Sequence, residues 1–196
     1  MLVEDSQIPE AALPVAELRR HLRMGTGFAE NDMQEAVLGS FLRASLAAIE
    51  ARSGKALLRR SFLLTLHQWP QGTRHRLPIS PVAEITEVAL VDAFGVTEVL
   101  DPGAYRLEAD QFTPHLMPRG SCLPAIPSGG AAEIRFEAGF GPGFGDLPSD
   151  LSQAVLLLAA HYYEYRDETG LSQGCMPFGV TSLIARYRPV RLGLGA

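Results

Sequence analysis

One stretch, residues 148–166, constrains the fold more than any other part of the chain. Apolar residues recur through it at helical spacing, and the opposite side carries Leu156, Leu157 and Tyr163 rather than polar residues. A helix that is apolar on two sides has to be covered on two sides. Its apolar run is much shorter than the roughly 20 residues that span a bilayer. The second side therefore meets either another part of the same chain or another copy of it.

The composition bounds the class of protein. The 196 residues suffice for one domain with a proper core, and 46% hydrophobic and 20% charged residues are ordinary for a globular protein. A net charge of −5 argues against a dedicated nucleic-acid-binding protein, but suits a surface past which DNA must slide. Cys122 and Cys175 match no metal or redox spacing, so both are expected to be free thiols. No signal peptide is evident at residues 1–7, so we expect synthesis in the cytoplasm.

Two more helices are predicted before residue 55, a short one from Leu13 to Leu22 and a longer one from Asn31 to Arg52. The longer helix carries two apolar stripes on different sides. One stripe comprises Met33, Ala36, Val37, Phe41, Ala44, Ala48 and Ala51, and the other comprises Leu38, Leu42, Leu46 and Ile49. This helix is therefore also predicted to be covered over most of its circumference.

The apolar period changes after Gly54. Alternating residues predict strands at 62–66 and 134–138, and further strands are predicted at 85–91, 96–100 and 105–107. Residues 110–130 are rich in proline and glycine, which predicts a long surface loop, and a last short helix is predicted at 180–187.

These elements predict an α+β fold that is mainly a helical bundle of about four helices, with an antiparallel β-sheet inserted between the second and third helices. The predicted organisation is a flexible N-terminus at 1–12, one domain at 13–188 and a C-terminal tail at 189–196. Within the domain, helices occupy 13–54 and 148–188, and the sheet occupies 57–140.

The glycine-rich run from Gly139 to Gly145 follows a predicted strand and precedes a helix, as a dinucleotide-binding loop does. Its glycine spacing differs from that motif, and Pro142 removes one N–H donor. The five histidines lack zinc-site spacing, and no serine-nucleophile motif is present. We therefore predict no catalytic residue, metal or cofactor, and keep a nucleotide-binding protein or enzyme using the Gly139–Gly145 turn as the alternative.

The end of the 148–166 stretch combines three tyrosines with Arg166. Aromatic residues and arginine are enriched at the centres of protein interfaces. Contact with a partner and packing against the helix at 180–187 are both open interpretations. The two helices that are apolar on more than one side, together with this cluster, favour a component of an assembly over an enzyme.

Four segments, taken in order, resemble the head–tail connector (adaptor) proteins of tailed bacteriophages and gene transfer agents. They cover most of residues 13–188. The first two segments are LPVAELRRHLR at 13–23 followed by Glu30-Asn31-Asp32, and AIEARSGKAL at 48–57. The third is FEAGFG at 136–141 with LPSDL at 147–151, Ala154 and HYYEYR at 161–166, and the fourth is MPFGV at 176–180 with Leu183, Tyr187 and Arg188. The proline-rich 110–130 stretch departs from the pattern.

The resemblance implies a structural protein of the virion neck, assembled in the bacterial cytoplasm. It implies a ring of twelve copies that joins the portal to the tail and extends the DNA channel. The partners would be further copies of the chain, the portal protein and a head-closure or tail protein. DNA would pass through the lumen without sequence-specific binding, and no membrane would be involved.

The candidate sites follow from this resemblance and from the apolar helices. The predicted subunit interface comprises Leu38, Leu42, Leu156, Tyr162, Tyr163, Tyr165 and Arg166. The predicted portal-binding tail comprises Arg186, Tyr187, Arg188, Val190, Arg191 and Leu192. The predicted tail-facing loop carries Phe112, His115, Met117 and Arg119.

Overall fold

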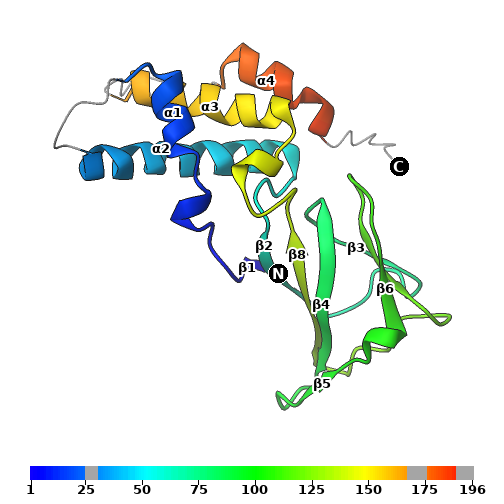
Figure 1. Cartoon of the computed structure of the whole chain (residues 1–196). Coiled ribbons are helices and arrows are strands. Elements are labelled where there is room, and N and C mark those ends of the chain that lie inside the picture. The colour runs from blue at the N-terminus through cyan, green and yellow to red at the C-terminus, as the bar shows by residue number, and fades with distance from the viewer. Residues whose placement is uncertain (25–30, 167–175, 189–196) are drawn as a thin grey trace. The chain divides into compact units, whose positions relative to one another are not determined.

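The structure is a computed structural model that describes residues 1–24, 31–166 and 176–188, without the side chains of residues 31–33. The chain divides into two compact units. The sheet unit comprises Met1–Ile8 and Leu58–Pro142, and the helical unit comprises Pro9–Leu57 and Gly143–Ala196. Seven of the eight described strands, between Arg60 and Ala138, lie between the second and third helices in the chain, and the first strand, Leu2–Glu4, precedes the first helix (Figure 1). That the chain behaves as one domain stays a prediction.

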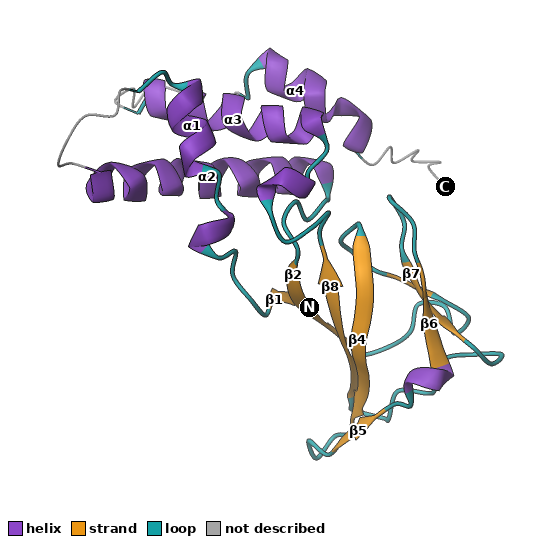
Figure 2. Cartoon of the chain, viewed as in Figure 1, coloured by secondary structure: helices purple, strands orange, loops and turns teal. Residues whose placement is uncertain are grey.

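The prediction of a mainly helical bundle is wrong. The described residues form four α-helices and eight strands, and the strands make two antiparallel sheets (Figure 2). The fold is therefore a sheet-rich α+β fold. The three strands that the sequence pattern missed are only two to four residues long, too short for an alternation to be visible.

The larger sheet has five strands in the order β1-β2-β8-β4-β5. Their bounds are Leu2–Glu4 for β1, Arg60–Leu66 for β2, Val82–Val91 for β4, Thr97–Val99 for β5 and Ala131–Ala138 for β8. Every second residue of β8 is buried, and Phe136 stacks on Phe62 of β2 with ring centres 5.6 Å apart. One face of the sheet thus forms the core of this unit.

The smaller sheet has three strands in the order β3-β7-β6. They are β3 at His75–Arg76, β6 at Tyr105–Glu108 and β7 at His115–Pro118. Strand β7 corrects the prediction of a loop throughout 110–130. Leu116 is fully buried in β7, and Pro118 is the last residue of β7, beyond the two residues that pair with β3.

Residues 1–12, for which a flexible segment is predicted, contain a strand and a short helical turn. Strand β1 pairs with β2, and a 3₁₀ turn, η1, follows at Glu10–Ala12. Two ion pairs hold the first residues: Glu4 accepts from Arg60 Nε at 2.7 Å, and Asp5 accepts from Arg135 at 2.9 Å. Both partners are distant in sequence, so no local pattern could indicate this order.

The helical unit is built around α3, which packs against the other three helices (Figure 1). The helices are α1 at Val15–His21, α2 at Asn31–Ser53, α3 at Ser149–Glu164 and α4 at Phe178–Ile184, which a 3₁₀ turn, η4, extends over Ala185–Tyr187. The core side chains, all at most 1% exposed, are Leu18, Leu38, Leu42, Leu46, Ile49, Leu151, Val155, Leu158, Val180 and Ile184. The two-sided apolar character of α3 is thus largely satisfied within its own unit.

Candidate functional site

Helix α2 buries only one of its two apolar stripes. Leu38, Leu42, Leu46 and Ile49 are at most 1% exposed, so this stripe forms the core. Leu38 and Leu42, which the sequence nominates for the subunit interface, therefore have no surface available in the free chain. A leucine side chain removes far more apolar area from water than an alanine, which explains why the leucine stripe faces inward.

The other stripe of α2 lies on the surface of the chain. Most of its side chains are exposed, and Phe41 and Ala48 are half-buried. The members recur at helical spacing over more than four turns and none is charged. We call this surface the α2 face; it comprises Ala36, Val37, Ser40, Phe41, Ala44, Ala47, Ala48 and Ala51.

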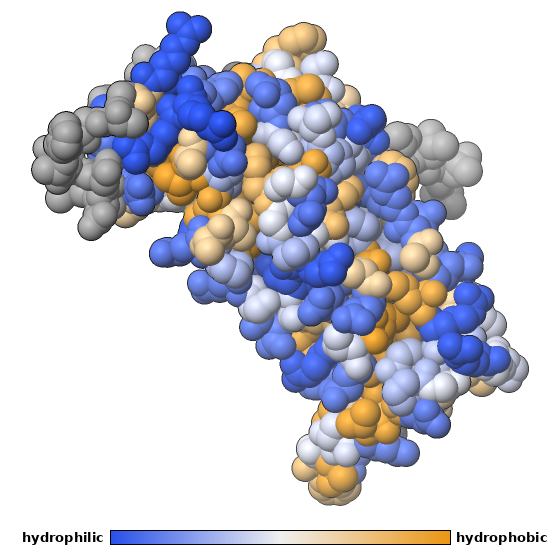
Figure 3. Space-filling model, in the orientation of Figure 1, coloured by the Kyte–Doolittle hydropathy of each residue, from blue (hydrophilic) through white to orange (hydrophobic). Residues whose placement is uncertain are grey.

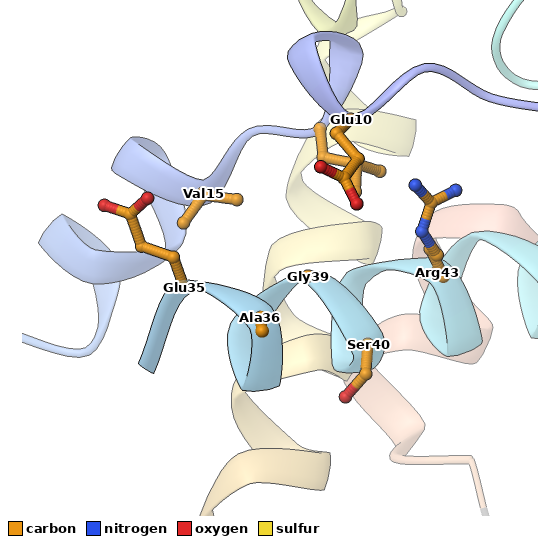
Figure 4. Close-up of a pocket in the computed structure, with 8 residues that line it drawn as sticks. Glu10, Val15, Glu35, Ala36, Gly39, Ser40 and Arg43 are labelled. Atoms are coloured by element: carbon orange, nitrogen blue, oxygen red, sulfur yellow. The ribbon is translucent and has the colours of Figure 1, made fainter. Parts of the chain in front are cut away.

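A pocket of about 450 Å³ adjoins the α2 face within the helical unit. It lies between η1, the start of α1 and α2, and Ala36 and Ser40 belong both to its lining and to the α2 face. Figure 4 shows the carboxylates of Glu10 and Glu35 reaching in from different elements, with Arg43 farther along α2. The α2 face is therefore bordered on one side by a pocket whose lining includes charged side chains.

The tyrosine cluster at the end of α3 extends the α2 face. Tyr163 meets Phe41 edge to face with ring centres 6.2 Å apart. Arg166 lies over the Tyr163 ring at 4.6 Å and donates to its carbonyl oxygen at 3.1 Å. Of the other predicted interface residues, Leu156 and Tyr162 are half-buried, and Tyr165 is 41% exposed.

The predicted portal-binding tail begins inside the helical unit. Tyr187 is 1% exposed, and its hydroxyl donates to Asp150 Oδ1 at 2.8 Å. Arg186 pairs with the other oxygen of Asp150, Nε to Oδ2 at 2.8 Å, and also contacts the Tyr187 hydroxyl. Arg188 is exposed, whereas residues 190–192 of the prediction lie outside the described residues. Tyr187 is thus an anchor of the last turn on α3 rather than a free surface residue.

The glycine-rich run serves backbone packing. Gly139 has a φ of 135°, and a Cβ there would lie 2.4 Å from the backbone nitrogen of Arg59. Its N–H donates to Pro81 O at 2.9 Å, and Gly141 O accepts from Arg59 N at 2.8 Å. The N–H of Gly143 donates to the Asp146 carboxylate at 2.9 Å. Two of the N–H donors that a phosphate loop would use are therefore already committed within the chain.

The predicted tail-facing residues lie in the smaller sheet and beside it. His115 and Met117 are half-buried in β7, and Phe112 is 42% exposed before it. Arg119 is exposed, and its Nε donates to Tyr105 O at 3.1 Å. Cys122 is an exposed free thiol, and Cys175 lies outside the described residues.

Sequence reasoning missed an exposed apolar group at the hairpin between β4 and β5. Phe94 is 92% exposed, Val96 66% and Val99 57%. The Asp92 carboxylate accepts from the N–H groups of Phe94 and Val96, both at 2.8 Å, so the turn is held in one conformation. Figure 3 shows this hairpin, at the bottom of the view, ending in apolar side chains. The turn sequence predicted the hairpin but gave no measure of its exposure.

The described residues hold neither a metal-binding group nor a membrane-spanning helix. Within residues 1–24, 31–166 and 176–188, no three acidic, histidine or cysteine side chains are grouped to hold a metal ion. Within the same ranges, no helix combines the length and hydrophobicity that crossing a membrane requires.

The chain was then compared with known proteins. No protein-family model and no curated protein matches it. Solved structures do match over its whole length. The "Neck of empty GTA particle computed with C6 symmetry" has a TM-score of 0.90 and 50% identity, and the match covers 100% of this chain and 98% of that chain.

Two further matches have the same coverage, 100% of this chain and 98% of the other. The "Virion of native gene transfer agent (GTA) particle" has a TM-score of 0.86 and 50% identity. The "Neck of native GTA particle computed with C12 symmetry" has a TM-score of 0.86 and 47% identity. Identity at this level over the full length shows common descent, and the chain belongs to the neck proteins of gene transfer agent particles.

Proposed function

We propose that this chain is the adaptor of a particle neck, a structural subunit without catalytic activity. Twelve copies form a ring that joins the portal to the tail and extends the DNA channel. The observation that carries the proposal is the full-length match, at 47% identity, to a neck computed with C12 symmetry. The particle is a gene transfer agent or a related phage-like virion.

The α2 face is proposed as one side of the contact between neighbouring copies. A cyclic ring repeats one heterologous contact, so each copy needs two different complementary surfaces. The α2 face supports this role because it is long, exposed and uncharged, and because Phe41 joins it to Tyr163 and Arg166. Leu156, Tyr162 and Tyr165 border the same region in the proposal. Leu38 and Leu42 contribute from the core by holding α2 in place.

The remaining predicted surfaces are assigned to the other neck partners. The basic C-terminal segment, from Arg186 to Leu192, is proposed to dock on the portal, with Tyr187 fixing its origin on α3. The residues of the predicted tail-facing loop, Phe112 to Arg119, are proposed to face the next tail component. The net charge of −5 supports a lumen wall along which DNA slides.

A charge placed in the centre of the α2 face tests the subunit contact. Ala44→Glu keeps a helix-compatible, solvent-exposed side chain, so the free chain should unfold within about 0.5 kcal/mol of the wild type. In the ring the carboxylate would be buried without a partner, so incorporation into particles should fall sharply. Ala16→Glu, on the exposed side of α1, is the matched control and should be incorporated normally.

The readout is the number of copies per particle, measured by quantitative mass spectrometry of particles from cells that produce only the variant. A folded Ala44→Glu protein present at the wild-type copy number would remove the α2 face from the contact. Loss of both variants from the particles would equally contradict it, because the effect would then not be specific to that face.

A further inference from the structure

The sheet unit contains a pocket of about 320 Å³ that is rich in basic side chains. It forms where β3 pairs with β7, with Arg76 opposite His115 in the register. The lining residues are Pro70, Gln71, Arg74, His75, Arg76 and His115. Two guanidinium groups and two imidazoles thus converge in a chain whose net charge is −5.

The two guanidinium groups have neutral partners. Arg74 Nε donates to Gln71 Oε1 at 3.1 Å, and Arg76 Nη2 donates to the carbonyl oxygen of Phe112 at 3.5 Å. Among the residues that the structure describes, neither group is paired with a carboxylate. A guanidinium has five N–H donors, so each retains most of its capacity for an anion. Two unneutralised cations at one pocket attract a negative ligand.

Two imidazoles also line the pocket. His75 is 9% exposed and packs beside Trp69 with ring centres 5.7 Å apart. Burial lowers the pKa of His75, and the neighbouring His115 lowers it further. His115 Nδ1 lies 3.9 Å from Glu108 Oε2, so the chain already places one carboxylate of its own at this histidine. The buried His75 ring is therefore a neutral hydrogen-bonding group at neutral pH, and the two arginines supply the positive charge.

We propose that this pocket binds the carboxylates of an acidic segment of a partner protein. Arginine binds carboxylates through paired N–H···O contacts, which gives both strength and orientation. The volume accommodates one or two acidic side chains rather than a folded surface. All residues of the pocket belong to the sheet unit of one chain, so binding to it does not require assembly of the ring.

The overall charge of the sheet unit favours a short acidic peptide over DNA. The sheet unit carries seven arginines against eleven aspartates and glutamates. A duplex presents a phosphate charge about every 1.7 Å, so its binding requires many cations over an extended surface. The sheet unit as a whole carries more carboxylates than arginines, which opposes the binding of an extended polyanion. A short acidic segment meets only the cations of the pocket itself.

Binding can be measured on the purified full chain at low salt. The probe is the fluorescein-labelled peptide acetyl-Glu-Asp-Glu-Asp, followed by fluorescence anisotropy, with its Lys counterpart and a short DNA duplex as competitors. Trp69 is the chain's single tryptophan and adjoins His75, so its emission reports whether the peptide occupies this pocket. We expect saturable binding of the acidic peptide with a change in tryptophan emission.

Matched variants assign the binding to the pocket. The double variant Arg74→Gln with Arg76→Gln should weaken the acidic peptide about tenfold or more, because charge-assisted hydrogen bonds are lost. Arg106→Gln removes an exposed arginine of β6 outside the pocket, and should leave the affinity nearly unchanged. All three arginines are exposed, so folding should be retained, which circular dichroism checks.

Three results would overturn the proposal. The first is no saturable binding of the acidic peptide to the folded wild type. The second is equal affinity of the double variant and the wild type. The third is a DNA duplex that binds more tightly than the peptide, which would make the pocket a phosphate site.

Discussion

Replacing Tyr187 with Phe removes one hydroxyl from the interior of the helical unit. The hydroxyl donates to Asp150 Oδ1 at 2.8 Å, and the side chain is 1% exposed. Burial raises the pKa of Tyr187, so the hydroxyl carries its proton at neutral pH and can donate. Hydrogen bonds to charged groups contribute about 1.5–3 kcal/mol to stability.

The expected loss lies at the lower end of that range. After the substitution Asp150 still accepts from Leu151 N at 3.0 Å and from Arg186 Nε at 2.8 Å, so its carboxylate is not left unpaired. Tyr187→Phe should therefore lower the free energy of unfolding by about 1.5 kcal/mol. Tyr165→Phe is the matched control, because that tyrosine is 41% exposed and should change stability by less than about 0.5 kcal/mol.

Urea unfolding followed by far-ultraviolet circular dichroism measures the difference, because the signal is dominated by helices. The comparison requires that the free energy of unfolding falls with urea concentration at the same slope in each variant. The fit to each unfolding curve gives this slope. A Tyr187→Phe protein as stable as Tyr165→Phe would refute the reasoning. It would mean that the hydroxyl does not anchor the last turn to α3.

The sheet unit allows three more predictions, all measured by urea unfolding followed by tryptophan fluorescence. Phe136→Ala should cost about 3–5 kcal/mol, because the ring is fully buried against Phe62; a loss below about 1 kcal/mol would contradict the stacking. Gly139→Ala should destabilise by more than about 1 kcal/mol, because φ is 135° and the Cβ meets the Arg59 backbone; wild-type stability would show that the turn can relax. The folded-state pKa of His75 is lowered, so the unfolded chain takes up the proton first, and the free energy of unfolding should fall as the pH drops below about 6.5. His75→Asn should show a shallower fall; an equal slope would show that His75 is not the cause of the pH dependence.

Long periodic segments were predictable from the sequence. The helices α2 and α3 and the strands β2 and β8 each show a clear period over seven or more residues, and β4 ends in an apolar run that a turn sequence closes. Strands β1, β3 and β7 could not be found in this way. They have two to four residues each and exist because distant strands pair with them. Missing them produced the erroneous picture of a mainly helical bundle.

The sequence shows both apolar stripes of α2 but not which of them is buried. The predicted interface took its α2 residues, Leu38 and Leu42, from the stripe that is buried, beside five residues of the 148–166 stretch. Comparing side-chain size would have indicated the reverse, since the leucine stripe buries more area than the alanine stripe. The burial of Tyr187 and the convergence of Arg74, Arg76 and His115 depend on contacts between segments far apart in sequence. No local pattern signals them.

The most direct test of the neck assignment is the number of copies of this chain in purified particles. Quantitative mass spectrometry of particles from the producing culture can measure it, with peptides of the portal protein as the internal standard. A ring that continues the portal predicts one copy of this chain for each portal subunit. Absence from the particles, or a ratio far from one, would contradict the account.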